Sequence, residues 1–240
     1  MATFVLVHGA WHGAWCWDKL VPLLEEVGHR ALPLDLPGHG RNSRAASEVT
    51  LQAYVDHVCQ ALDEQPRPAV LVGHSMGGVV ITQAAELRPD KISCLVYLSA
   101  FLPANGQSLS QLSRANANSG SLVTANLVIS EDRSCSMIKG EAVREVFYHD
   151  CEETDVEQAK ALLCPQPMAP LGTPVTTNQA NFGRVPRVYI ECLQDQALPL
   201  AYQRQMQQSL PCSQVLSLDT GHSPFFSAPE ELAALLVSLV

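Results

Sequence analysis

Short apolar runs rich in β-branched residues alternate with segments of helical period along the first 99 residues. Each run is apolar along most of its length, which is typical of strands buried on both faces in a parallel sheet. The segments between the runs place apolar residues three or four positions apart, as Tyr54, Val58 and Leu62 do, and therefore predict helices. The expected strands are Thr3–Val7, Arg30–Leu34, Ala69–Val72 and Ile92–Ser99, and the expected helices are Trp17–Val27, Leu51–Glu64 and Met76–Leu87.

This alternation stops after Leu102 and resumes near residue 186. Between these points Ser and Asn are frequent over 105–126, helical period returns at Glu141–Tyr148 and Asp155–Leu163, and prolines then accumulate. The alternation ends with expected strands Arg187–Cys192 and Gln214–Leu218 and expected helices Leu200–Ser209 and Pro229–Leu239. We therefore expect one α/β domain over 1–240, with a mostly parallel, doubly wound core (1–101 and 186–240) and a helical cap inserted over about 102–185.

Composition and charge narrow the class of protein. The chain has 240 residues, of which 47% are hydrophobic and 16% charged, so it can bury a full core. With 15 Lys and Arg against 24 Asp and Glu, and no basic cluster, neither nucleic acid nor a membrane is an expected partner. The amino terminus has no basic or long apolar leader, which predicts a cytoplasmic location. The eight cysteines contain no CxxC pair, so no metal site is expected.

The strongest local motif is Gly73-His74-Ser75-Met76-Gly77-Gly78, between an expected strand and an expected helix. In that context the glycines allow a sharp turn that projects a serine hydroxyl above the carboxyl edge of the sheet. We therefore predict that Ser75 is a nucleophile. The alternative is an ordinary strand-to-helix turn.

A serine nucleophile needs a general base and an acid that orients it, in the chain order Ser, Asp or Glu, His for this topology. His222 follows the expected strand Gln214–Leu218, and Asp195 follows Arg187–Cys192, so both lie at carboxyl ends of strands. Asp219 is too close to His222 along the chain, and Asp35 precedes the serine. We therefore assign Asp195 as the acid, with a capping or turn aspartate as the alternative.

Acyl transfer also requires backbone N–H donors where negative charge develops on the carbonyl oxygen. The Met76 amide follows the serine at a helix start and is one expected donor. The second is expected from the loop after the first strand, where Gly9 allows a turn and Ala10 presents its amide.

The opening run 4–17, FVLVHGAWHGAWCW, resembles the α/β-hydrolase branch that contains plant methylesterases, hydroxynitrile lyases and pyrethroid-hydrolase-like esterases. The runs 73–78, 98–103, 187–195 and 221–224 follow in the same order. The resemblance implies an α/β-hydrolase fold and a carboxylesterase with the triad Ser75, Asp195 and His222 and oxyanion amides at Ala10 and Met76. A homodimer would also agree with it. The lyases of this branch carry a lysine after the triad histidine and a threonine in the oxyanion loop, where this chain has Ser223 and Ala10.

We therefore expect a serine esterase for small to medium, hydrophobic esters, with no cofactor and no metal. The apolar residues expected to line its pocket are Trp11, Phe101, Phe147, Leu198 and Phe225. Two alternatives are lyase-type C–C cleavage and a small-molecule receptor that retains the hydrolase fold without turnover.

Overall fold

A parallel sheet forms the centre of the computed structural model, which describes residues 1–115 and 120–240. Within those residues this sheet has six strands in the order β2-β1-β3-β4-β8-β9, and each neighbouring pair is parallel. The strands are β1 (Thr3–Val7), β2 (Arg30–Leu34), β3 (Ala69–His74), β4 (Ile92–Leu98), β8 (Arg187–Cys192) and β9 (Gln214–Leu218). In the register of β1 and β3, Val7 lies opposite Gly73, so the loops that follow these two strands begin side by side.

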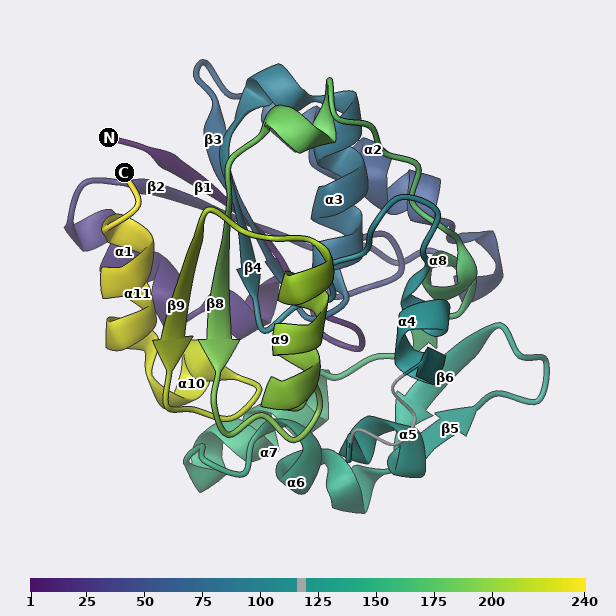
Figure 1. Ribbon diagram of the computed structural model, residues 1–240. Helices are drawn as coiled ribbons and strands as arrows, with labels where there is room; N and C mark the ends of the chain where they lie inside the picture. The colour runs from purple at the N-terminus through teal and green to yellow at the C-terminus, as the bar shows by residue number, and fades with distance from the viewer. Residues whose placement is uncertain (116–119) are drawn as a thin grey trace.

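Helices cover both faces of this sheet (Figure 1). One face carries α1 (Leu20–Glu26) and α11 (Pro229–Val237), and the other carries α2 (Leu51–Asp63), α3 (Gly77–Leu87) and α9 (Leu200–Ser209). The central strands are sealed between these layers: Val5, Leu71 and Leu95 are all fully buried. The arrangement confirms the expected doubly wound α/β fold.

For most core elements, the bounds expected from the sequence agree with the observed bounds or differ from them by one or two residues. The expected helix Trp17–Val27 is instead a 3-10 turn, η1 (Ala14–Trp17), followed by α1. The Asp35 carboxylate accepts a hydrogen bond from the Ala14 amide at 2.7 Å, and this bond anchors the start of the tight turn. The remaining core segments are the 3-10 turns η2 (Ala46–Glu48) and η3 (Pro89–Lys91) and the short helix α10 (Pro224–Ser227), and a further 3-10 turn, η5 (Phe182–Arg184), belongs to the inserted segment.

Most of the inserted segment, residues 102–185, lies at the end of the molecule toward which the arrowheads of β8 and β9 point, whereas its last part, from residue 173 to η5, runs back along α3 to the start of β8 (Figure 1). Its elements are α4 (Leu109–Ala115), α5 (Leu122–Asn126), β5 (Leu127–Ile129), β6 (Cys135–Ile138), η4 (Gly140–Ala142), α6 (Val143–Phe147), α7 (Glu153–Leu162), β7 (Gln166–Pro167) and α8 (Ala169–Gly172), with η5 following near its end. The helices expected at Glu141–Tyr148 and Asp155–Leu163 correspond to η4 with α6 and to α7. Part of the expected Ser- and Asn-rich excursion, residues 116–119, lies outside the described residues.

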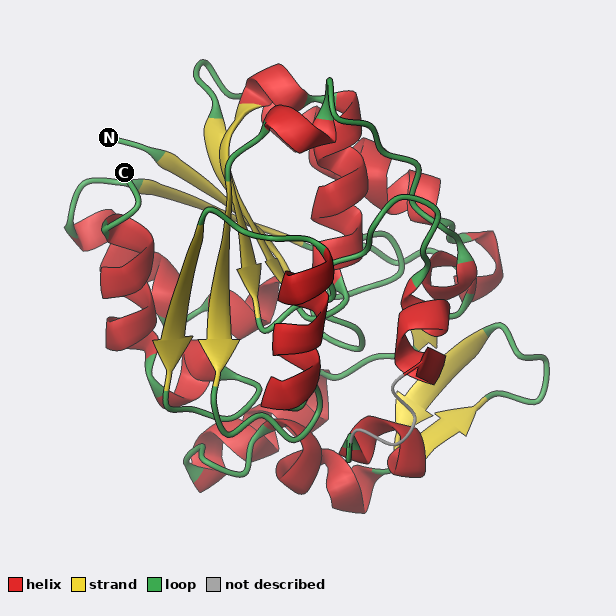
Figure 2. Cartoon of the chain, viewed as in Figure 1, coloured by secondary structure: helices red, strands yellow, loops and turns green. Residues whose placement is uncertain are grey.

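A second, antiparallel sheet of β5, β6 and β7 was not predicted (Figure 2). Its strands have two to four residues, which is too short for a period of two to be recognised. Of the helices in the described part of the chain, none combines the length and apolar character that a membrane crossing requires.

Candidate active site

Ser75 occupies the sharp turn between β3 and α3. Its φ of 53° lies in the left-handed region, which is costly for a residue other than glycine. The turn is held by the end of β4, because the Ser75 amide donates to Leu98 O at 3.3 Å and Phe101 N donates to Ser75 O at 3.0 Å. The serine predicted as nucleophile is therefore fixed at the carboxyl edge of the sheet.

All three glycines of the motif are required by close approach, and a Cβ at Gly78 would overlap Phe101 O. A Cβ at Gly73 would lie 2.8 Å from the Gly77 backbone, and a Cβ at Gly77 would lie 2.7 Å from Val7 O. Neither contact is compatible with a side chain, so these positions bring α3 and the end of β1 into direct contact with the turn.

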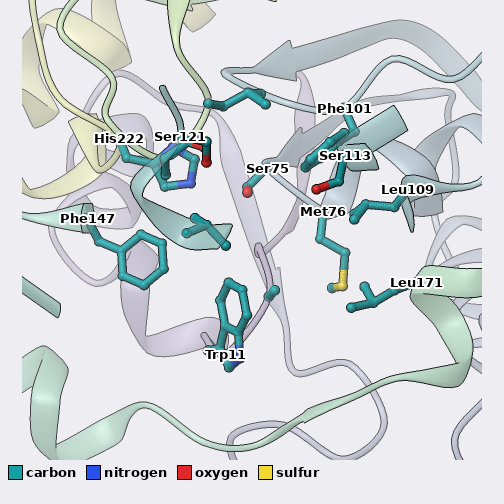
Figure 3. Close-up of a pocket in the computed structure, with 14 residues that line it drawn as sticks. Trp11, Ser75, Met76, Phe101, Leu109, Ser113, Ser121, Phe147, Leu171 and His222 are labelled. Atoms are coloured by element: carbon teal, nitrogen blue, oxygen red, sulfur yellow. The ribbon is translucent and has the colours of Figure 1, made fainter. Parts of the chain in front are cut away.

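His222 and Asp195 lie together although 27 residues separate them along the chain. His222 Nδ1 is 2.6 Å from Asp195 Oδ2, and both side chains are essentially buried. The His222 carbonyl oxygen accepts a hydrogen bond from His74 Nε2 at 2.8 Å, which fixes the backbone of this loop. Because Nδ1–H donates a hydrogen bond to Asp195, the free lone pair of the neutral ring is on Nε2, which can therefore accept a proton. Figure 3 shows the His222 ring and the Ser75 hydroxyl at the same pocket.

The Asp195 carboxylate accepts hydrogen bonds from four donors. Oδ1 receives the amides of Ala197 and Leu198, both at 2.7 Å, and Oδ2 receives the Ser99 hydroxyl beside His222 Nδ1. A buried carboxylate needs such partners, because an unpaired buried charge is costly. Ser99 is fully buried directly after β4 and was not among the site residues predicted from the sequence. The sequence feature that could have identified Ser99 is a polar residue at the carboxyl end of a buried strand.

The two predicted oxyanion donors also lie at this pocket. Ala10 and Met76 both line it, and neither backbone amide donates to an acceptor within residues 1–115 and 120–240. Two free N–H groups beside a serine hydroxyl can bind an oxygen that becomes negative.

Three buried histidines surround these groups: His8, His12 and His74. Burial lowers the pKa of all three, because the charged imidazolium loses its hydration, and it lowers the pKa of His12 to about 3. They are therefore neutral hydrogen-bonding groups at neutral pH. His74 Nε2 bonds the His222 loop, and His12 Nδ1 bonds Ala10 O at 2.7 Å.

The pocket has a volume of about 70 Å³ and is mainly apolar. Four of the five residues predicted to line it do so: Trp11, Phe101, Phe147 and Leu198. Phe225 lies instead in the core, fully buried against the rings of Trp17 and His74, which corrects its assignment. The lining also contains two hydroxyl groups that the sequence analysis missed, those of Ser113 and Ser121 (Figure 3). Both belong to the inserted segment, where the sequence has no regular period to indicate which residues point inward.

No cluster of metal-ligating side chains occurs among the residues that the structure describes. The groups at this pocket that can take part in a reaction are the serine hydroxyl, the imidazole and the backbone amides.

The depressed histidine pKa values predict that the protein loses stability on acidification. An unfolded histidine has a pKa of about 6.5. As the pH falls from about 6.5 toward 3, the unfolded chain binds a proton at position 12 that folded His12 does not bind, so the free energy of unfolding falls. The fall approaches about 1.4 kcal/mol per pH unit for one such histidine. Urea denaturation between pH 6.0 and 4.5 should give His12→Gln a slope that is smaller by about 1 kcal/mol per pH unit.

The comparison uses the slopes, so a general loss of stability in the variant does not affect it. Equal slopes for the wild type and His12→Gln would mean that His12 binds its proton in the folded state within this range.

Comparison with known proteins agrees with this geometry. The family described as "Alpha/beta hydrolase family" matches residues 4–235. The chain is 35% identical to putative methylesterase 11, chloroplastic, of Arabidopsis thaliana, over 98% of this chain and 63% of that protein. It is also 35% identical to the pyrethroid hydrolase of Sphingobium wenxiniae, over 97% of this chain and 85% of that protein. A crystal structure of an Arabidopsis methylesterase superimposes with a TM-score of 0.87 at 31% identity, covering 100% of this chain and 98% of that one.

The chain spans only 63% and 55% of the lengths of the putative chloroplastic methylesterases 11 and 13. The family match nevertheless covers almost all of its 240 residues. The chain belongs to the alpha/beta hydrolase family.

Proposed function

We propose that this chain is a serine carboxylesterase that hydrolyses uncharged, hydrophobic esters through an acyl-enzyme on Ser75. The observation that carries the proposal is one pocket lined by Ser75, His222, Ala10 and Met76, with His222 Nδ1 held 2.6 Å from Asp195 Oδ2. The relatives named as methylesterases and pyrethroid hydrolase support the same reaction class.

The first half-reaction forms the acyl-enzyme. Ser75 Oγ attacks the ester carbonyl carbon while His222 Nε2 accepts the hydroxyl proton. The carbonyl oxygen becomes negative and receives the Ala10 and Met76 amides. Asp195 stabilises the positive charge that forms on the imidazole. The bond to the alcohol then breaks, and His222 returns the proton to the departing alcohol oxygen.

The second half-reaction uses the same groups. A water molecule gives a proton to His222 and attacks the acyl carbon. The bond to Ser75 Oγ then breaks, the proton returns to that oxygen, and the carboxylic acid leaves.

The lining of the pocket supports the substrate class. None of its fourteen described lining residues is Lys, Arg, Asp or Glu. A charged acyl group would therefore be buried without an ion partner, which costs several kcal/mol. The small cavity volume favours short acyl groups, and the rings of Trp11, Phe101 and Phe147 provide apolar contacts.

The absence of a cation among these lining residues also weighs against lyase-type cleavage, since a departing cyanide would have no positive side chain beside it. The position directly after His222, where the resembling lyases carry a lysine, is held by Ser223, whose side chain is uncharged and fully buried. A receptor without turnover is disfavoured because serine, imidazole and carboxylate are all in place.

We further propose that residues 102–185 act as the cap over this pocket, because Leu109, Ser121, Phe147 and Leu171 from that segment line it. The cytoplasmic location and the homodimer stay predictions.

The proposal predicts that wild-type protein releases p-nitrophenol from p-nitrophenyl acetate and that Ser75→Ala reduces kcat at least about 10³-fold, because the variant lacks the hydroxyl on which the acyl-enzyme forms. The mono-p-nitrophenyl ester of succinate should have a kcat/KM at least about 10-fold lower than that of the butyrate ester, because its carboxylate is charged. A parallel assay with mandelonitrile tests the alternative. Cyanide release without ester turnover, or neither activity in folded protein, would contradict the proposal.

Ser99 should contribute through the acid. Ser99→Ala removes one of the two donors on Asp195 Oδ2 and leaves the backbone of Ala197 and Leu198 in place. We expect kcat for p-nitrophenyl acetate to fall about 10-fold with little change in KM, since the hydroxyl lies outside the pocket lining. Ser93→Ala is the matched control, an exposed serine on β4, the strand that Ser99 directly follows. Equal kcat values for the two variants would show that Ser99 is not needed to hold the acid.

A further inference from the structure

Every carbonyl group of residues 9–11, the loop that carries the Ala10 amide, accepts a hydrogen bond. Gly9 O is 2.7 Å from His8 Nδ1, Ala10 O is 2.7 Å from His12 Nδ1, and Trp11 O receives the Cys164 amide at 2.9 Å. The carbonyl and N–H of one trans peptide unit point in opposite directions. The hydrogen bond from His8 to Gly9 O therefore directs the Ala10 N–H of the same peptide unit away from His8. The hydrogen bond from His12 to Ala10 O fixes the following unit, Ala10–Trp11.

His12 connects this loop to the inserted segment. Its Nε2 lies 2.5 Å from the hydroxyl of Tyr148, which directly follows α6. His12 is 1% exposed and Tyr148 is fully buried, so water does not compete for this bond. The loop is also tied to the same segment by Trp11 Nε1, which donates to Ser136 O at 3.0 Å.

The partners of His12 define its tautomer. The Ala10 carbonyl can only accept, so Nδ1 must carry the proton, and Nε2 must then accept from the Tyr148 hydroxyl. The lowered pKa of His12 agrees with a neutral ring. Without the tyrosine hydroxyl, Nε2 would accept no hydrogen bond from Tyr148, and the ring could carry its proton on Nε2 instead. In that tautomer the lone pair of Nδ1 would face Ala10 O, and the hydrogen bond that holds this carbonyl would be lost.

We infer that Tyr148 is a positioning residue for the oxyanion site. Through His12 it holds the Ala10–Trp11 peptide unit, which adjoins the unit that carries the Ala10 N–H, and so keeps the backbone of this loop in the conformation that presents that N–H to negative charge. The inference rests on the proposed esterase function and adds that the inserted segment controls the stabilisation of the tetrahedral intermediate as well as the shape of the pocket. Tyr148 is not among the residues that line the pocket, so its hydroxyl acts at a distance from the substrate.

The test separates binding of a tetrahedral adduct from binding of a planar carbonyl. The trifluoromethyl ketone 1,1,1-trifluoro-4-phenylbutan-2-one can add Ser75 Oγ to its carbonyl and form an oxyanion, whereas 4-phenylbutan-2-one serves as the ground-state ligand. For Tyr148→Phe we expect kcat for p-nitrophenyl acetate to fall about 10-fold and the inhibition constant of the trifluoromethyl ketone to rise by about the same factor. The inhibition constant of the parent ketone should change less than about twofold.

Tyr54→Phe is the matched control. The Tyr54 hydroxyl is also buried and also faces a histidine, His39 Nδ1 at 3.5 Å, but His39 bonds Pro37 O at 3.3 Å instead of a carbonyl of residues 9–11. We expect this variant to leave kcat and both inhibition constants within about twofold of the wild type. Thermal unfolding of both variants, with concentrations normalised by active-site titration, accounts for any loss of folded protein.

Two results would overturn the inference: equal kcat values and inhibition constants for Tyr148→Phe and Tyr54→Phe, or an equal loss of affinity for both ketones in Tyr148→Phe. The latter would mean that Tyr148 only shapes the pocket. If the wild type itself neither hydrolyses the ester nor binds the trifluoromethyl ketone, the proposed function fails and this inference fails with it.

Discussion

The sharp turn at Ser75 is the constraint on which the rest of the site depends. A serine with φ of 53° would not hold this conformation alone, so the structure fixes it from several sides. Gly73 and Gly77 allow the helix and the end of β1 to approach, and the end of β4 bonds the turn on both its amide and its carbonyl. Because those strands are parallel, their carboxyl ends meet at one edge, and the groups needed beside the serine can come from separate loops.

A buried carboxylate and a set of buried neutral histidines position the groups around that turn. The charged support is Asp195, whose four donors hold the carboxylate against His222 Nδ1. The neutral support is the set of buried histidines, each of which bonds a backbone carbonyl near the pocket. A neutral imidazole suits this role because it offers one donor and one acceptor in a fixed direction. The cost is stability at acidic pH, where the unfolded chain binds protons that these rings exclude.

The core could be predicted because its strands are apolar throughout and the apolar residues of its helices recur with a clear helical period. Ser75, Asp195 and His222 could be predicted because each follows a recognisable strand in a fixed chain order. Contacts between distant segments could not. Tyr148 reaches His12 across 136 residues, and nothing in its own sequence surroundings indicates the bond. Phe225 was assigned to the pocket because sequence places it near a strand end but does not say which way its ring points.

The central claim is that Ser75 is the nucleophile that His222 and Asp195 activate. The most direct measurement is stoichiometric labelling with a fluorophosphonate, followed by mass spectrometry of the proteolytic peptides. The account predicts one phosphonyl group per chain, on the peptide that contains Ser75, and no label on His222→Ala over the same time. A label on another residue, or an active protein that remains unlabelled, would contradict it.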